Sequence, residues 1–173
     1  MRSPRSDARS LWRRAVGVRT ASSRSDRAAA PVTAVIRVVA ALIDDGEGRL
    51  LLVRKRGTDR FMQAGGKPEA GESAREALVR ELMEELGLAV DPDALRELGA
   101  FRTDAANEPD HALEAQVFAL RVPSGDLPPR AELAETRWAT PAEADALGDR
   151  LAPLARLLLA EPDAQVRSVP SGP

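Results

Sequence analysis

The sequence has 173 residues, a formal net charge of −2 and no cysteine, which is the size of one ordinary domain. Without cysteine the chain has no disulfide framework, no thiolate zinc site and no cysteine nucleophile. The composition, 43% hydrophobic and 30% charged, is typical of a globular protein. Residues 32–43 form the longest apolar stretch. This stretch contains Thr33 and Arg37 and is shorter than the roughly 20 residues that a membrane span needs, so we expect no association with a membrane.

Charge is distributed unevenly along the chain. Residues 1–30 hold eight arginines and two aspartates, whereas acidic residues are in excess over the remainder. Nucleic-acid binding requires clustered cations that neutralise phosphates, so we expect no nucleic-acid partner for the acidic part. Arginine far outnumbers the two lysines, Lys55 and Lys67, a bias of GC-rich genomes that favours a bacterial, cytoplasmic protein.

Composition divides the chain into three parts. Residues 1–30 are rich in Arg, Ser and Ala and are expected to form a disordered tail. An organelle transit peptide has a similar composition and is the alternative interpretation. Residues 31–161 are expected to form the folded domain, and residues 162–173, with Pro, Ser and Gly, a second tail.

The first predicted elements form a hairpin. The β-branched run Val32–Ile43 predicts a strand, and the Asp- and Gly-rich residues 44–48 predict a turn. A second strand is expected from Leu50 to Val53, antiparallel to the first. A short extended segment follows at residues 61–63 and ends at the double glycine 65–66.

A helix is predicted over residues 73–86, with Ser73 as its N-cap and Gly87 as the left-handed residue that ends it. The elements after it alternate in type. In chain order they are strands at residues 98–102 and 114–122, a loop at 124–129, a strand at 136–139, and helices at 141–147 and 150–160. Strands before, between and after helices predict a mixed α/β domain.

The predicted helix concentrates carboxylates on one side. At 100° per residue, Glu81, Glu84 and Glu85 lie within about 100° of its surface, beside a stripe of leucines. Like charges at this spacing destabilise a helix, whereas Mg²⁺ and Mn²⁺ favour hard oxygen ligands and bridge them to phosphates. Glu72 precedes the helix in a glycine-containing loop. The pattern therefore indicates a divalent-metal site for a phosphorylated ligand, and a solvated acidic helix face is the alternative.

A longer pattern surrounds these residues. The segment Gly66–Leu88 matches G-x5-E-x7-R-E-U-x-E-E-x-G-U, with U a bulky aliphatic residue, at every defined position. The fixed identities would coincide by chance on the order of 10⁻⁸ per start position. This pattern is the Nudix box, and the chain resembles the Nudix (MutT-like) hydrolases over roughly residues 31–161. The resemblance implies an α/β/α sandwich with a mixed β-sheet, in which the box forms a loop–helix–loop.

The resemblance also implies an activity. Nudix hydrolases use Mg²⁺ or Mn²⁺ and cleave the pyrophosphate bond of nucleoside di- or triphosphate derivatives by attack of water on phosphorus. Hydrolysis of a nucleoside diphosphate sugar or an ADP-ribose-like conjugate is one alternative, and a non-catalytic nucleotide-sensing module on the same fold is another. Many relatives are homodimers, but no sequence feature points to a dimer surface.

Individual roles follow from the resemblance. The implied metal ligands are Gly65 through its carbonyl, Glu72, Glu81, Glu84 and Glu85. Arg80 is implied to orient a helix glutamate through an ion pair. The general base is left open among Glu81, Glu132 and Glu135, the last two from the acidic segment before a late strand.

Other residues carry weaker expectations. Lys67, Arg54 and Arg56 are candidates for contacts with substrate phosphates, and a solvated position is the alternative for each. The three phenylalanines and Trp138 are expected to pack in the core. Asn107 is a candidate for reading a base edge. Gln63 and Ala64 precede the double glycine where many relatives that remove oxidised nucleotides have proline, so the sequence predicts no substrate subclass.

Overall fold

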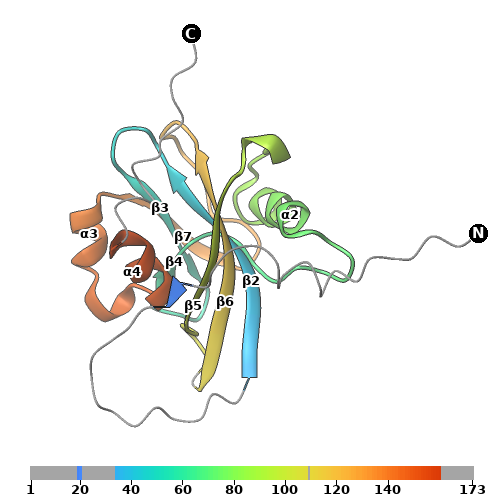
Figure 1. The fold of residues 1–173 in the computed structure, drawn as a ribbon. Coiled ribbons are helices and arrows are strands. Elements are labelled where there is room, and N and C mark those ends of the chain that lie inside the picture. The colour runs from blue at the N-terminus through green and yellow to red at the C-terminus, as the bar shows by residue number, and fades with distance from the viewer. Residues whose placement is uncertain (1–18, 21–33, 109, 161–173) are drawn as a thin grey trace, which may run out of the picture.

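The computed structural model describes residues 19–20, 34–108 and 110–160. The predicted tails therefore lie outside the described residues, except for Arg19–Thr20, which form the short strand β1. The described chain is a seven-stranded sheet with helices on both faces (Figure 1). No helix in these ranges is long and apolar enough to cross a membrane.

The sheet is mixed, as the sequence predicts. Its strands are β2 (Ala34–Asp44), β3 (Leu50–Lys55), β4 (Phe61–Met62), β5 (Arg96–Asp104), β6 (His111–Arg121) and β7 (Leu133–Ala139), with β1 at one edge. The order is β1-β5-β6-β2-β3-β4, and β7 pairs with β3. β2 and β6 are parallel over their whole length, whereas β5 pairs antiparallel with β6 and β3 with β2. The predicted hairpin is present, but its two strands pair only at Asp44 and Leu50.

Helices form the outer layers. α2 (Ala74–Leu86) covers one face of the sheet, and α3 (Pro141–Asp145) and α4 (Pro153–Ala160) cover the other (Figure 1). Two 3₁₀ turns, η1 (Pro92–Ala94) and η2 (Gly148–Arg150), complete the described elements. This arrangement confirms the predicted α/β/α sandwich.

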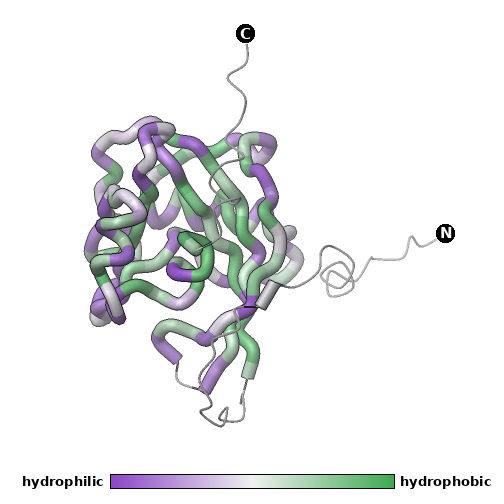
Figure 2. Tube along the Cα trace, turned by 60° about the vertical axis from the view of Figure 1, so that its left-hand side comes forward, coloured by the Kyte–Doolittle hydropathy of each residue, from purple (hydrophilic) through white to green (hydrophobic). Residues whose placement is uncertain are grey.

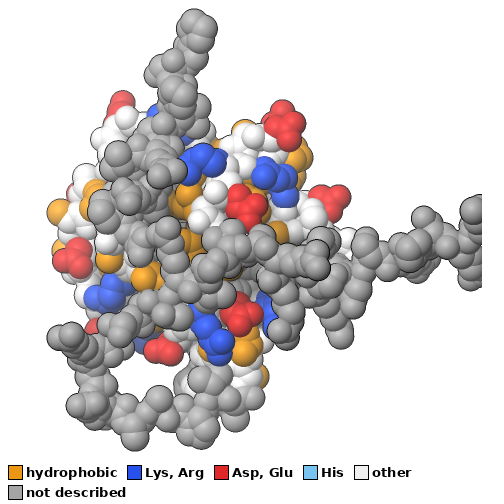
Figure 3. Space-filling model, in the orientation of Figure 1, with side chains coloured by type: hydrophobic (Ala, Val, Ile, Leu, Met, Phe, Trp, Pro, Cys, Tyr) orange, Lys and Arg blue, Asp and Glu red, His pale blue; other side chains and the backbone are white. Residues whose placement is uncertain are grey.

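Apolar side chains fill both spaces between the layers. Leu78, Leu82 and Leu86 of α2 share one buried cluster with apolar side chains of β2 and β3, among them Val39 and Val53. On the opposite face the leucines of α4 pack against β2, β5 and β6. Each buried leucine contributes roughly 1.5–3 kcal/mol of transfer free energy, so these contacts fix α2 on the sheet. Figure 2 shows the hydrophobic segments running along the strands, and Figure 3 shows acidic and basic side chains interspersed on one face.

The ends of α2 agree with the sequence prediction. The Ser73 side chain accepts a hydrogen bond from the Glu76 backbone N–H, and the Glu76 carboxylate accepts one from Ser73 N–H. At the other end Gly87 has φ +65°, and its N–H donates to the carbonyls of Leu82 and Met83. A capping box and a left-handed C-terminal glycine therefore fix where this helix starts and stops.

The predicted start of the last helix is wrong. Residues 150–160 were expected to be helical, but α4 begins only at Pro153. Ala152 N–H donates to the carbonyl of Phe61 at 2.8 Å, and Leu151 forms a parallel bridge with Phe61. Proline also disfavours helical geometry in the residue before it, so this segment is extended and joins the edge of β4. The last two helices are therefore shorter than predicted.

The aromatic residues pack as expected. Phe61, Phe101 and Phe118 are buried. Trp138 is partly buried against the cluster beneath α2, and its indole N–H donates to the carbonyl of Gly125 at 3.1 Å. These four side chains therefore pack in or against the hydrophobic core.

Candidate active site

The double glycine joins the sheet to the helix that carries the glutamates. After β4 the chain runs beside β2, where Ala41 N–H donates to the carbonyl of Ala64 and Val39 N–H to that of Gly66. Gly65 has φ +138°, and a Cβ there would collide with the carbonyl of Val39. A Cβ on Gly66 would collide with the carboxylate of Glu81. Only glycine fits at position 65, because the backbone of β2 is so close. At position 66 a Cβ would displace the Glu81 carboxylate.

Glu85 is the most deeply buried carboxylate of the site, with an exposed fraction of 0%. Its Oε2 accepts a hydrogen bond from Gly65 N–H at 2.8 Å. Its Oε1 has no hydrogen-bond partner, and the nearest cation is Lys55 Nζ at 3.7 Å. Burial raises the pKa of Glu85 to about 7, against the lowering effects of the Gly65 hydrogen bond and of Lys55.

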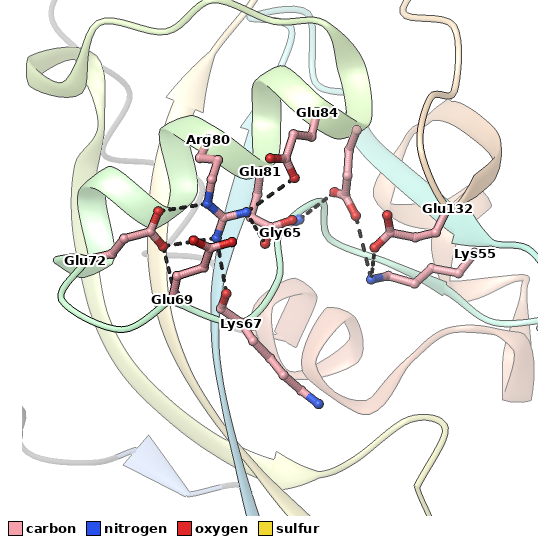
Figure 4. Close-up of polar contacts among 10 residues, drawn as sticks. Lys55, Gly65, Lys67, Glu69, Glu72, Arg80, Glu81, Glu84 and Glu132 are labelled. Carbon is pink, nitrogen blue, oxygen red and sulfur yellow. Dashed lines mark hydrogen bonds and ion pairs between the residues drawn. The ribbon is translucent and has the colours of Figure 1, made fainter.

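Lys55 connects Glu85 to a second carboxylate outside the box. Its Nζ lies 2.8 Å from Oε1 of Glu132, which precedes β7 (Figure 4). Burial opposes the charge on Lys55, but the hydrogen bond to Glu132 and the charge of Glu85 raise its pKa overall. The same hydrogen bond lowers the pKa of Glu132. The lysine is therefore a charged bridge between two carboxylates.

Arg80 organises the other side of the site. Its guanidinium donates to both oxygens of Glu72, at 2.8 and 3.0 Å, and to Glu81 at 3.0 Å (Figure 4). Weaker contacts reach Glu84 at 3.3 Å and the carbonyl of Lys67 at 3.2 Å. The hydrogen bonds with Glu72 raise the pKa of Arg80 and lower that of Glu72. One guanidinium thus offsets the repulsion among three carboxylates.

A cavity of about 430 Å³ opens beside these groups. Its charged end is lined by Lys55, Lys67, Arg80, Glu81 and Glu132. Its other end is lined by aliphatic side chains of β2, β6 and α4 and by polar residues at the end of β5. The volume lies in the range of sites for small molecules, roughly 300–1,000 Å³.

The donors suit a hard divalent cation, although they do not form a complete site as they stand. No three acidic or histidine side chains among the described residues converge on one point. Instead Glu81 is paired with Arg80, and Glu85 lies beside Lys55. The buried Oε1 of Glu85 nevertheless lacks a hydrogen-bond donor. A carboxylate oxygen in this state is available to a cation that prefers oxygen ligands.

The family model of the NUDIX domain matches residues 35–160, which is most of the chain. The chain belongs to the NUDIX family. As a NUDIX protein with a complete box, it is a pyrophosphohydrolase. The matched range runs from the second residue of β2 to the last residue of α4.

Solved structures of bacterial proteins share this NUDIX fold. The Escherichia coli ORF135 protein is 30% identical, with a TM-score of 0.57 over 80% of this chain and 95% of that chain. A NUDIX hydrolase from Nitrosomonas europaea is 25% identical, with a TM-score of 0.62 over 75% and 89%. A MutT NUDIX hydrolase from Burkholderia pseudomallei is also 25% identical, with a TM-score of 0.57 over 73% and 97%. The curated proteins contain no match to the sequence.

The structure separates the two base candidates outside the NUDIX box. Glu132 lines the cavity, whereas Glu135 pairs with Arg54 at 3.1 Å and with Arg137 at 3.1 Å. Arg54 and Arg137 lie over the ring of Phe61, on the face that packs against α3 and α4. Glu135 therefore lies on the face of the sheet opposite α2 and away from Glu85.

Of the other residues predicted to contact the substrate or the metal, some line the cavity and others do not. Lys67 lines the cavity and is exposed, and its side chain extends away from Arg80 (Figure 4). Arg54 and Arg56 do not line the cavity. The Glu84 side chain is about half exposed and does not line the cavity. Gly65 contributes its N–H to Glu85, and the role of its carbonyl stays a prediction.

Several cavity residues were not predicted from the sequence as site residues, among them Lys55 and Gln63. The sequence did contain a signal for Lys55, because lysine is rare in this arginine-rich chain. In the structure both lysines line the cavity. Gln63 precedes the double glycine, but nothing in the sequence distinguishes its side chain from that of an exposed glutamine.

Proposed function

We propose that the protein is a Mg²⁺-dependent hydrolase that cleaves the pyrophosphate bond of a nucleoside di- or triphosphate derivative, with water as the attacking group. The observation that carries the proposal is the buried Oε1 of Glu85, which has no hydrogen-bond donor, next to a cavity that two lysines line. An anionic substrate would bind poorly beside bare carboxylates, and a divalent cation removes this conflict.

The residues that would hold the cation are Glu81 and Glu85, with support from Glu72, Glu84 and the carbonyl of Gly65. When bound, the cation supplies neutralising charge at the phosphates and lowers the pKa of water. Arg80 holds Glu81 and Glu72 in fixed orientations through its hydrogen bonds.

The lysines and one carboxylate supply the remaining chemistry. Lys55 and Lys67 offer ammonium groups to the phosphates at the charged end of the cavity. The base that accepts the proton of the attacking water is Glu81 or Glu132, because both line the cavity. Glu135 is excluded from this role in our proposal by its ion pairs on the other face.

The test is hydrolysis of a substrate panel with Mg²⁺, with products separated by chromatography. The panel contains ordinary and oxidised nucleoside triphosphates, ADP-ribose, nucleotide sugars and dinucleotides. We expect turnover to require the cation. Replacing the residue that acts as the base, in Glu132→Gln or in Glu81→Gln, is expected to lower turnover at least about 100-fold. Turnover is expected to be unchanged in Glu135→Gln.

The products decide between the proposal and its alternatives. Triphosphates give a monophosphate and pyrophosphate, whereas a conjugate gives two phosphorylated halves. If folded protein with bound cation turned over none of these compounds, the proposal would fail and a binding module would replace it.

A further inference from the structure

Another part of the cavity lining is mainly aliphatic. Aliphatic side chains line it from β2, β6 and α4: Ile36, Val38, Leu113 and Leu154. Asp104, at the end of β5, and Asn107 and Glu108, in the following turn, add polar groups to the lining. None of the residues that line this cavity is aromatic. The space therefore has apolar walls with a few hydrogen-bonding groups, which is the usual construction of a site that orients a small molecule.

Gln63 is a buried, uncharged polar residue in the lining of this cavity. Only 7% of it is exposed, and its Oε1 has no hydrogen-bond partner. The next residue, Ala64, packs in the cluster beneath α2. Because side chains alternate along an extended segment, Gln63 is directed to the opposite face, toward α4.

A buried amide oxygen without a donor is unfavourable in the free protein, and buried polar atoms normally have partners. The other buried glutamine shows the usual situation, because the amide of Gln116 donates to the carboxylate of Glu97. The terminal torsion of glutamine is soft, so a ligand in the cavity can supply the missing partner at little conformational cost.

We propose that Gln63, with Asp104 and Asn107, determines specificity by binding an amino-bearing nucleobase in this end of the cavity. A carboxamide carries a donor and an acceptor side by side and pairs with a base edge that carries the complementary pair. The Asp104 carboxylate only accepts hydrogen bonds, which favours a base with an exocyclic amino group over uracil. The aliphatic walls contact the faces of the ring. This inference rests on the proposed function, since the base is the group attached to the cleaved phosphates.

The test compares Gln63→Leu with the wild type and with Gln116→Leu as a matched control. We measure kcat/KM with Mg²⁺ for ATP, GTP, CTP and UTP, and for inorganic tripolyphosphate, which has no base. We expect Gln63→Leu to lower kcat/KM for the preferred amino-bearing nucleotide by about 5- to 100-fold, mainly through KM. Hydrolysis of tripolyphosphate is expected to stay unchanged. Gln116→Leu is expected to keep the wild-type selectivity.

Thermal unfolding separates recognition from a structural role. Gln63→Leu removes an unpaired polar group, so its Tm is expected to equal or exceed that of the wild type. Gln116→Leu breaks a hydrogen bond and is expected to lower the Tm. A lower Tm in Gln63→Leu, together with equal losses on every substrate, would show that Gln63 only supports the fold and would overturn the proposal.

Binding of the four nucleoside monophosphates, measured by calorimetry, does not depend on turnover. We expect tighter binding of an amino-bearing monophosphate than of UMP, and loss of that difference in Gln63→Leu. Equal binding of all four by the wild type would overturn the inference even if the enzyme is active. Selective binding without hydrolysis of any nucleotide would instead refute the proposed function and support the recognition site.

Discussion

The burial of Glu85 predicts a measurable dependence of stability on pH. Its pKa is about 7 in the folded protein, raised from 4.5 by burial. The folded state therefore binds the proton more tightly, and the free energy of unfolding is highest below the unfolded pKa and falls as the pH rises through 7. Between pH 5 and pH 8, linkage with these two pKa values gives a loss of about 2.5 kcal/mol.

The assay is urea unfolding of the wild type and of Glu85→Gln, with a chelator present, at several pH values. The variant cannot ionise at this position, so its stability relative to the wild type is expected to increase by about 2.5 kcal/mol from pH 5 to pH 8. Saturating Mg²⁺ is expected to reduce this difference, because bound cation stabilises the ionised form. A difference that does not change with pH would refute the argument that burial raises this pKa.

Three further substitutions test the geometry. Gly66→Ala places a methyl group against the Glu81 carboxylate, and we expect kcat to fall about 100-fold; wild-type kcat would contradict the close approach of loop and helix. Leu82→Ala leaves a cavity beneath α2, where Leu82 is fully buried, and we expect a loss of about 2–5 kcal/mol in urea unfolding; a loss below about 1 kcal/mol would count against this packing. Ser73→Ala removes the hydrogen bond to Glu76 N–H and is expected to lower stability by about 1 kcal/mol; no change would mean that the cap is not important.

The sequence predicted α2 and its ends correctly because local chemistry determines them. Ser73, Glu76 and Gly87 act within a few residues of the helix ends, and the leucine stripe specifies the buried face. Tertiary contacts decide the start of α4, where the hydrogen bond from Ala152 to Phe61 joins residues far apart in the chain. No local pattern could reveal that contact.

The sequence also could not show which side chains of the acidic segment at the start of β7 face the site. Leu133 packs beneath α2, whereas Glu135, two residues later, lies with Arg54 on the opposite face. In a regular strand these two residues would share a face. The pairing of β3 and β7 shifts register between Arg54 and Lys55, and such a shift reverses which side chains face each layer. Regular alternation would have placed Glu135 on the α2 face with Leu133, so the sequence could not show that Glu135 lies away from the site.

The most direct test of the account is titration of the purified protein with Mg²⁺ by calorimetry, in the wild type, Glu85→Gln and Glu135→Gln. We predict binding to the wild type and to Glu135→Gln, and its loss in Glu85→Gln, because Glu85, unlike Glu135, has a buried oxygen without a hydrogen-bond partner. Equal binding by all three proteins, or none by the wild type, would contradict the assignment of the α2 glutamates as the metal site.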